Sequence, residues 1–108
     1  MLQTIIHEIQ CKVGQNAKEN WELIDKSKPE YFFFHLSSFP SCYVVLECEN
    51  IPYIETIIAC AKLCKSRTKY KNVPNLYVDY CTCGNLRKFW KVGEVEFRSN
   101  KKTLKIMV

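Results

Sequence analysis

The chain has 108 residues, 47% of them hydrophobic, and a net charge of +5 at pH 7. This length supplies one hydrophobic core and excludes two independent domains, so we expect a single domain over residues 1–108. No apolar run approaches the ~20 residues that cross a bilayer, and residues 1–8 lack the basic and apolar regions of a signal peptide. We therefore expect a cytoplasmic protein without membrane insertion.

Residues 4–13 alternate roughly between apolar and polar side chains, which predicts a half-buried strand. Gly14 ends this strand, because glycine permits the positive φ of a turn, and Asn16 caps a short helix over residues 16–25. Residues 14–20 leave two interpretations open, a loop that cradles a phosphate or an ordinary turn that starts a helix. Spacing alone does not separate them.

Residues 31–36 and 42–48 are rich in aromatic and β-branched side chains, and a turn-forming segment joins them. They predict two adjacent antiparallel strands. Pro52 lies in the first turn of the longest helix, where apolar residues recur at helical spacing from Ile54 to Cys64.

Three further strands are predicted at residues 76–82, 93–98 and 103–108. The turn at residues 99–102 predicts that the last two strands pair as a hairpin. The order β-α-β-β-α-β-β-β favours an α+β fold, a mostly antiparallel sheet with two helices on one side.

The seven cysteines suit free thiols better than disulfides, because their number is odd and no export signal is present. Cys42, Cys60 and Cys64 lie in apolar segments, where cysteine packs as a small hydrophobe. A zinc site that joined Cys60 and Cys64 to Cys81 and Cys83 would lack the two-residue gaps typical of structural zinc. We therefore expect no metal.

Signatures of catalysis are scarce. The chain contains no G-x-S-x-G elbow, no Walker pattern and no G-x-G-x-x-G loop. His35 ends an aromatic strand, where histidine is more often structural than a base, and Glu47 and Glu49 have no histidine within sequence reach. We expect a protein that is not an enzyme and that has no cofactor.

Charge is distributed unevenly along the chain. Residues 1–61 hold four Lys against eight Asp or Glu, a net charge of −4, and residues 62–108 hold twelve Lys or Arg against three, a net charge of +9. A basic half suits a polyanionic partner, and a solvated surface is the alternative interpretation.

The basic residues of the second half gather in two groups. The first consists of Lys62, Lys65, Arg67, Lys69 and Lys71, and the second of Arg87, Lys88 and Lys91 around Phe89 and Trp90. Phe89 and Trp90 suit either base stacking or a hydrophobic anchor for a loop.

Several segments resemble the NFACT-R family of RNA-binding domains. Residues 14–20 resemble its G-x-N-x-x-x-N element, residues 33–35 its W-F-H strand end, and residues 40–46 its P-G-S-H-V-I-L segment. The segments that follow in order are residues 59–65, 85–88 and 92–97. These last three are most similar to the small eukaryotic coiled-coil branch of the family, here without the coiled-coil tail. Phe33 replaces the family tryptophan and Cys42-Tyr43 replaces its Ser-His pair, so the contribution of those positions stays open.

The resemblance implies a nucleic-acid-binding module without catalytic activity, since larger relatives bind tRNA and the large ribosomal subunit. We expect binding of tRNA or rRNA, in association with the ribosome, mainly through phosphates. The expected contacts are Asn16, Lys18, Asn20, His35, Lys62, Lys65, Arg67, Arg87 and Lys88. This expectation requires the cations to converge on one surface. A DNA-binding domain and a protein-interaction module that docks on a ribosomal or membrane-associated partner remain alternatives.

Overall fold

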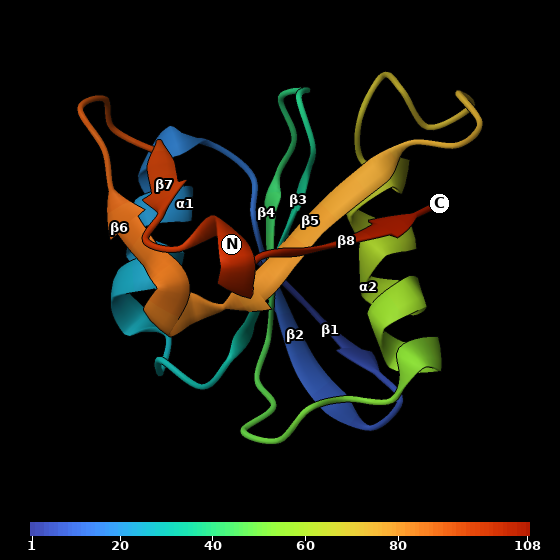
Figure 1. Cartoon of the computed structure of the whole chain (residues 1–108), viewed down its shortest axis with the longest axis horizontal. Coiled ribbons are helices and arrows are strands. Elements are labelled where there is room, and N and C mark those ends of the chain that lie inside the picture. Colours follow the sequence, from blue (N-terminus) through green and yellow to red (C-terminus); the bar gives the residue numbers. More distant parts are fainter.

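Six antiparallel strands form one sheet in the computed structural model, which describes residues 1–108, and two more strands form a small second sheet. The larger sheet has the order β1-β2-β4-β3-β5-β8, and β6 pairs with β7 (Figure 1). The elements are β1 Leu2–Ile6, β2 Ile9–Gly14, α1 Ala17–Lys26, β3 Phe32–Leu36, β4 Tyr43–Leu46, α2 Ile54–Ser66, β5 Tyr77–Thr82, β6 Leu86–Lys88, β7 Val95–Phe97 and β8 Leu104–Met107. The predicted α+β class, the two helices and the order of the predicted elements are confirmed, with two differences: the first predicted strand is divided in two, and β6 is a strand that the sequence did not predict. Neither helix has the length and apolar character that crossing a membrane requires.

The strand predicted over residues 4–13 is a hairpin. His7 and Glu8 turn the chain with φ angles of 48° and 68°, and β1 pairs with β2 so that Ile6 lies opposite Ile9. Positive φ is uncommon outside glycine, and no glycine or asparagine marks this turn. The apolar alternation therefore continues through it and gives no sign that the strand ends. His7 Nδ1 lies 2.7 Å from Thr56 Oγ1, so the tip of the hairpin is fastened to α2.

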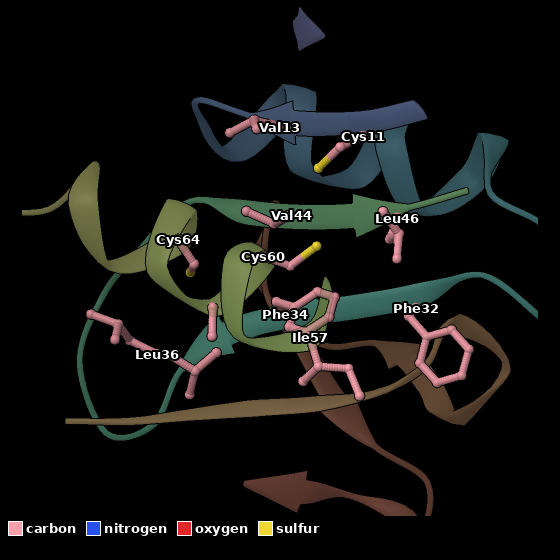
Figure 2. Packing of buried hydrophobic residues seen from close by; sticks show 12 residues of the cluster. Cys11, Val13, Phe32, Phe34, Leu36, Val44, Leu46, Ile57, Cys60 and Cys64 are labelled. Carbon is pink, nitrogen blue, oxygen red and sulfur yellow. The ribbon is translucent and has the colours of Figure 1, made fainter. Parts of the chain in front are cut away.

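The two helices cover opposite faces of the sheet, which corrects the expectation that both lie on one side (Figure 1). Phe32, Phe34 and Leu36 of β3 pack with α2, whereas Phe33 packs in the cluster that contains Leu23 of α1. Figure 2 shows the α2 side, where side chains of the helix lie over Phe34 and its neighbours. Because both faces of the central strands are buried, their apolar residues run consecutively, which is the pattern of a strand covered on two sides.

The predicted hairpin of residues 93–98 and 103–108 is wrong. β7 pairs with β6, so that Leu86 lies opposite Phe97, and β8 pairs with β5 at the edge of the larger sheet. The buried side chain of Asn85 holds the crossing segment, because its Nδ2 donates to Ser99 O and Thr103 Oγ1 while its Oδ1 accepts from Ser99 N, each at 3.0 Å. The turn-forming residues at 99–102 do not reveal that the Asn85 side chain, and not pairing between β7 and β8, holds this segment.

Candidate functional site

Four segments that are distant in sequence meet at one end of the sheet and surround a cavity of about 770 Å³. They are the start of α1, the β3–β4 connection, the segment that follows α2, and the β6–β7 loop; all four lie toward the top of Figure 1. The lining residues are 15–17 and 20, 40–42, 67–70, and 91–94. We call this cavity the loop-end cavity.

The start of α1 forms one wall of the loop-end cavity, and side chains of the helix itself satisfy two of the backbone donors there. Asn16 Oδ1 accepts from Glu19 N at 2.9 Å, which confirms the predicted helix cap, and Glu19 Oε1 accepts from Gln15 N at 3.1 Å. These reciprocal bonds fix the first turn of the helix. The N-terminus of a helix carries a partial positive charge, so this wall of the cavity favours an anion.

Gly14 permits close contact between β2 and α1, and this is a different role from the predicted turn. Its φ is not positive, and a Cβ at this position would lie 2.3 Å from Asn20 Oδ1 and 3.0 Å from Asn20 Cα. Asn20 is only 8% exposed, and its Oδ1 has no hydrogen-bond partner. Because Oδ1 is buried against Gly14, the Nδ2 amide is the polar group that Asn20 leaves for the cavity, and it is a donor.

Three cations line the loop-end cavity and form no ion pair. They are Arg67 and Lys69, just past the end of α2, and Lys91 in the β6–β7 loop. Glu94 is the single carboxylate in the lining. The charged side chains of the lining therefore have a net positive charge, which favours an anion.

The β6–β7 loop is fixed in place by bonds to the body of the protein. Tyr43 Oη donates to Gly93 O at 2.5 Å, and Trp21 Nε1 donates to Glu94 O at 2.8 Å. Gly93 has a φ of 89°, and a Cβ there would lie 2.6 Å from both Cα and Cβ of Ala17. The hydroxyl of Tyr43 thus tethers the loop that carries Lys91.

Several of the predicted cations lie elsewhere. Lys62 is exposed on α2 outside the cavity lining, and Lys65 Nζ donates to Val108 O at 2.9 Å. On the opposite face of the sheet, Arg87 pairs with Glu96 and Lys88 pairs with Asp25, so their charges are already compensated. Lys18 is exposed on the first turn of α1 and does not line the cavity.

His35 lies in a different hollow, of about 330 Å³, which shares only Pro40 with the loop-end cavity. Its ring is nearly parallel to that of Phe33, with centroids 6.3 Å apart, and meets the edge of Tyr43 at 5.4 Å. Burial lowers the pKa of His35. A neutral imidazole in this aromatic setting does not attract a phosphate.

Of the predicted contacts, the structure brings Asn16, Asn20 and Arg67 together, and it adds Lys69, Tyr70 and Lys91. Lys69 and Lys91 belong to the two basic groups visible in the sequence. What the sequence does not reveal is that the end of α2 and the β6–β7 loop reach the same end of the sheet from opposite faces.

A second cavity, of about 680 Å³, lies beside the β1–β2 turn and the start of α2. Since α2 has 13 residues, and so is about 20 Å long, it separates this cavity from the loop-end cavity at its other end. Glu8 and Glu55 line it, with no cationic side chain. Its charge is the opposite of what a polyanion requires.

No family model and no curated protein matches the chain. The fold is similar to a solved structure, the C-terminal part of the fibronectin/fibrinogen-binding protein from Streptococcus suis. The TM-score is 0.88 over 98% of this chain, with 24% sequence identity. The chain spans 43% of the length of that structure. At this level of identity the likeness shows the fold alone.

Proposed function

We propose that this chain is a non-enzymatic RNA-binding module that contacts phosphates through the loop-end cavity. The observation that carries the proposal is the set of three unpaired cations, Arg67, Lys69 and Lys91, gathered around a cavity that also receives the N-terminus of α1. Phosphate oxygens accept hydrogen bonds and carry negative charge, so they match every donor in this lining.

The resemblance to NFACT-R domains supports RNA as the polyanion. The segments that resemble the family at residues 14–20, 40–46 and 92–97 each contribute to the lining of the loop-end cavity. Three of the six resembling segments therefore line the cavity, and Arg67, Lys69 and Lys91 lie next to resembling segments but outside them. The expected partners remain tRNA or rRNA, with the ribosome as the larger assembly.

The proposal predicts binding that weakens steeply with salt, because each neutralised phosphate releases counterions. Three phosphate contacts give a log–log slope of affinity against salt between about −2 on a single strand and −3 on a duplex. The measurement is a titration of fluorescently labelled tRNA at two or more salt concentrations. Salt-insensitive binding, or no binding at micromolar protein, rejects the proposal.

Charge-reversal variants locate the contact. Lys69→Glu and Lys91→Glu should each weaken binding and reduce the salt slope by about 1. Lys62→Glu is the matched control, because it changes the net charge by the same amount on an exposed part of α2 outside the cavity. An equal loss for all three variants would show only a long-range effect of net charge. Unlabelled DNA that competes as well as RNA would assign the site to DNA as well.

A further inference from the structure

Aromatic side chains occur in two of the segments that contribute to the loop-end cavity. In the β6–β7 loop, Trp90 precedes Lys91 and is 90% exposed, with Phe89 packed against it at 6.3 Å between ring centroids. Beyond the end of α2, Tyr70 lines the cavity and packs against the exposed ring of Phe39 at 4.5 Å. Flat rings therefore accompany the cations in both segments.

Trp90 is held in an ordered loop. Phe89 N donates to Glu94 O at 3.0 Å and Glu94 N donates to Lys91 O at 2.9 Å, so the loop is closed across its base. The bonds from Tyr43 and Trp21 fasten the same loop to β4 and α1. The indole of Trp90 has no hydrogen-bond partner and is almost fully exposed, so the fold leaves a free aromatic surface next in the chain to Lys91.

The other tryptophan is already engaged. Trp21 donates its Nε1 hydrogen to Glu94 O, and the Lys88 ammonium lies 5.0 Å from its ring centroid. Its surface is thereby occupied by the protein itself. Of the two tryptophans, only Trp90 is available for a ligand.

These observations select among forms of RNA. In a duplex the faces of the bases are stacked on one another, so a protein aromatic side chain reaches a base face only where the strand is unpaired. Cations that hold a backbone beside aromatic rings that receive bases are the combination found in single-strand sites. A site for duplex phosphates alone would need no exposed indole.

We propose that the loop-end cavity binds an unpaired segment of RNA, with one base stacked on Trp90 and its phosphates on Lys91, Arg67 and Lys69. This inference rests on the proposed function and adds to it the strandedness of the ligand. The exposed position of Trp90 makes it testable without disturbing the core.

The test compares a single-stranded RNA of about 10 nucleotides, within the range of single-strand sites, with a blunt duplex of the same sequence. The single strand should bind more tightly and quench tryptophan fluorescence. Trp90→Phe should abolish most of the quench while retaining binding. Trp90→Ala should weaken single-strand binding at least about fivefold, since stacking on one base contributes about 1–3 kcal/mol.

Tyr53→Ala is the matched control, because Tyr53 is 84% exposed and lies by the cavity at the other end of α2. It should leave affinity and quench unchanged. Equal affinity for duplex and single strand, or unaltered binding by Trp90→Ala, overturns the inference. Salt-dependent binding that depends on Lys69 and Lys91 would then still support the proposed function, whereas absence of binding to either RNA overturns both.

Discussion

Replacement of Tyr43 by phenylalanine removes one hydroxyl and keeps the ring. Tyr43 is buried, its ring meets that of Phe33 edge-on at 4.9 Å, and its Oη donates to Gly93 O at 2.5 Å. The loss of one such bond costs about 1 kcal/mol, because the packing of the ring persists. For a domain of this size we expect a fall in Tm of about 4 °C, measured by circular dichroism.

The same substitution has a signature in alkaline solution. Burial raises the pKa of Tyr43 to about 12, against the model-compound value of 10. The unfolded chain therefore loses this proton at a lower pH than the folded protein. The stability that the neutral phenol provides is complete below pH 10 and declines as the pH rises through 12. Tyr43→Phe lacks this group, so the stability difference between wild type and variant should shrink between pH 10 and 12.

Denaturant unfolding of both proteins at pH 7 and at a series of values above 9 measures this difference. A difference that stays constant over the alkaline range would refute the argument that Tyr43 is held neutral by burial. Unchanged stability at pH 7 would refute the tether to Gly93. Tyr43→Phe should also weaken single-strand RNA binding, because the hydrogen bond from Tyr43 to Gly93 O fastens the loop that contains Lys91 and Trp90.

Three further predictions address stability and reactivity. Gly14→Ala should cost about 1–3 kcal/mol in denaturant unfolding, because its Cβ would lie 2.3 Å from Asn20 Oδ1, whereas Gly84→Ala should cost less, since the nearest atom there is Pro29 Cβ at 3.1 Å. In timed alkylation followed by mass spectrometry, Cys42 should react before the buried cysteines. A hydrogen bond to the Cys64 thiol lowers the pKa of Cys42, and Arg67 acts in the same direction, against the effect of burial. Burial raises the pKa of Cys81 to about 11 and that of Cys83 to about 12. Faster alkylation of Cys81 or Cys83 than of Cys42 would contradict this order. Burial lowers the pKa of His35, so the stability that its neutral ring provides is present above pH 6.5 and declines as the pH falls below that value. In thermal unfolding, the Tm of His35→Gln should therefore fall less on acidification than the Tm of the wild type. An identical fall in Tm would contradict the burial of His35.

The sequence predicts the elements of this fold better than their arrangement. Residues 31–36 and 42–48 predict paired strands because their β-forming side chains are continuous, and β3 and β4 do pair. The consecutive apolar residues Phe32-Phe33-Phe34 indicate that both faces of the sheet are buried at this strand. The sequence of one strand does not indicate which helix covers which face. The turn at His7 and Glu8 escapes prediction because a contact with Thr56, 49 residues away, supports it.

The site was predictable only in part, for a related reason. Asn16 is identifiable as a cap from local chemistry, and Arg67 from the run of basic residues at the end of the second helix. Arg87 and Lys88 have the same local appearance as Lys91, yet Glu96 and Asp25 neutralise them. Whether a cation is free or paired depends on carboxylates brought close by tertiary structure, and the sequence contains no local signal for that.

The pairing of charges explains how a chain with an acidic first half forms a cavity lined by unpaired cations. Carboxylates of that half, such as Asp25, Glu47 and Glu49, engage lysines away from the loop-end cavity. What this half contributes to the cavity is uncharged, including Asn16, Asn20 and the first residue of α1. The cations come from segments that leave opposite faces of the sheet, so the positive field exists only when both helices are docked. A polyanion that binds this cavity more tightly than it binds the unfolded chain should raise the unfolding temperature, and the rise should grow with the logarithm of its concentration once the site is saturated.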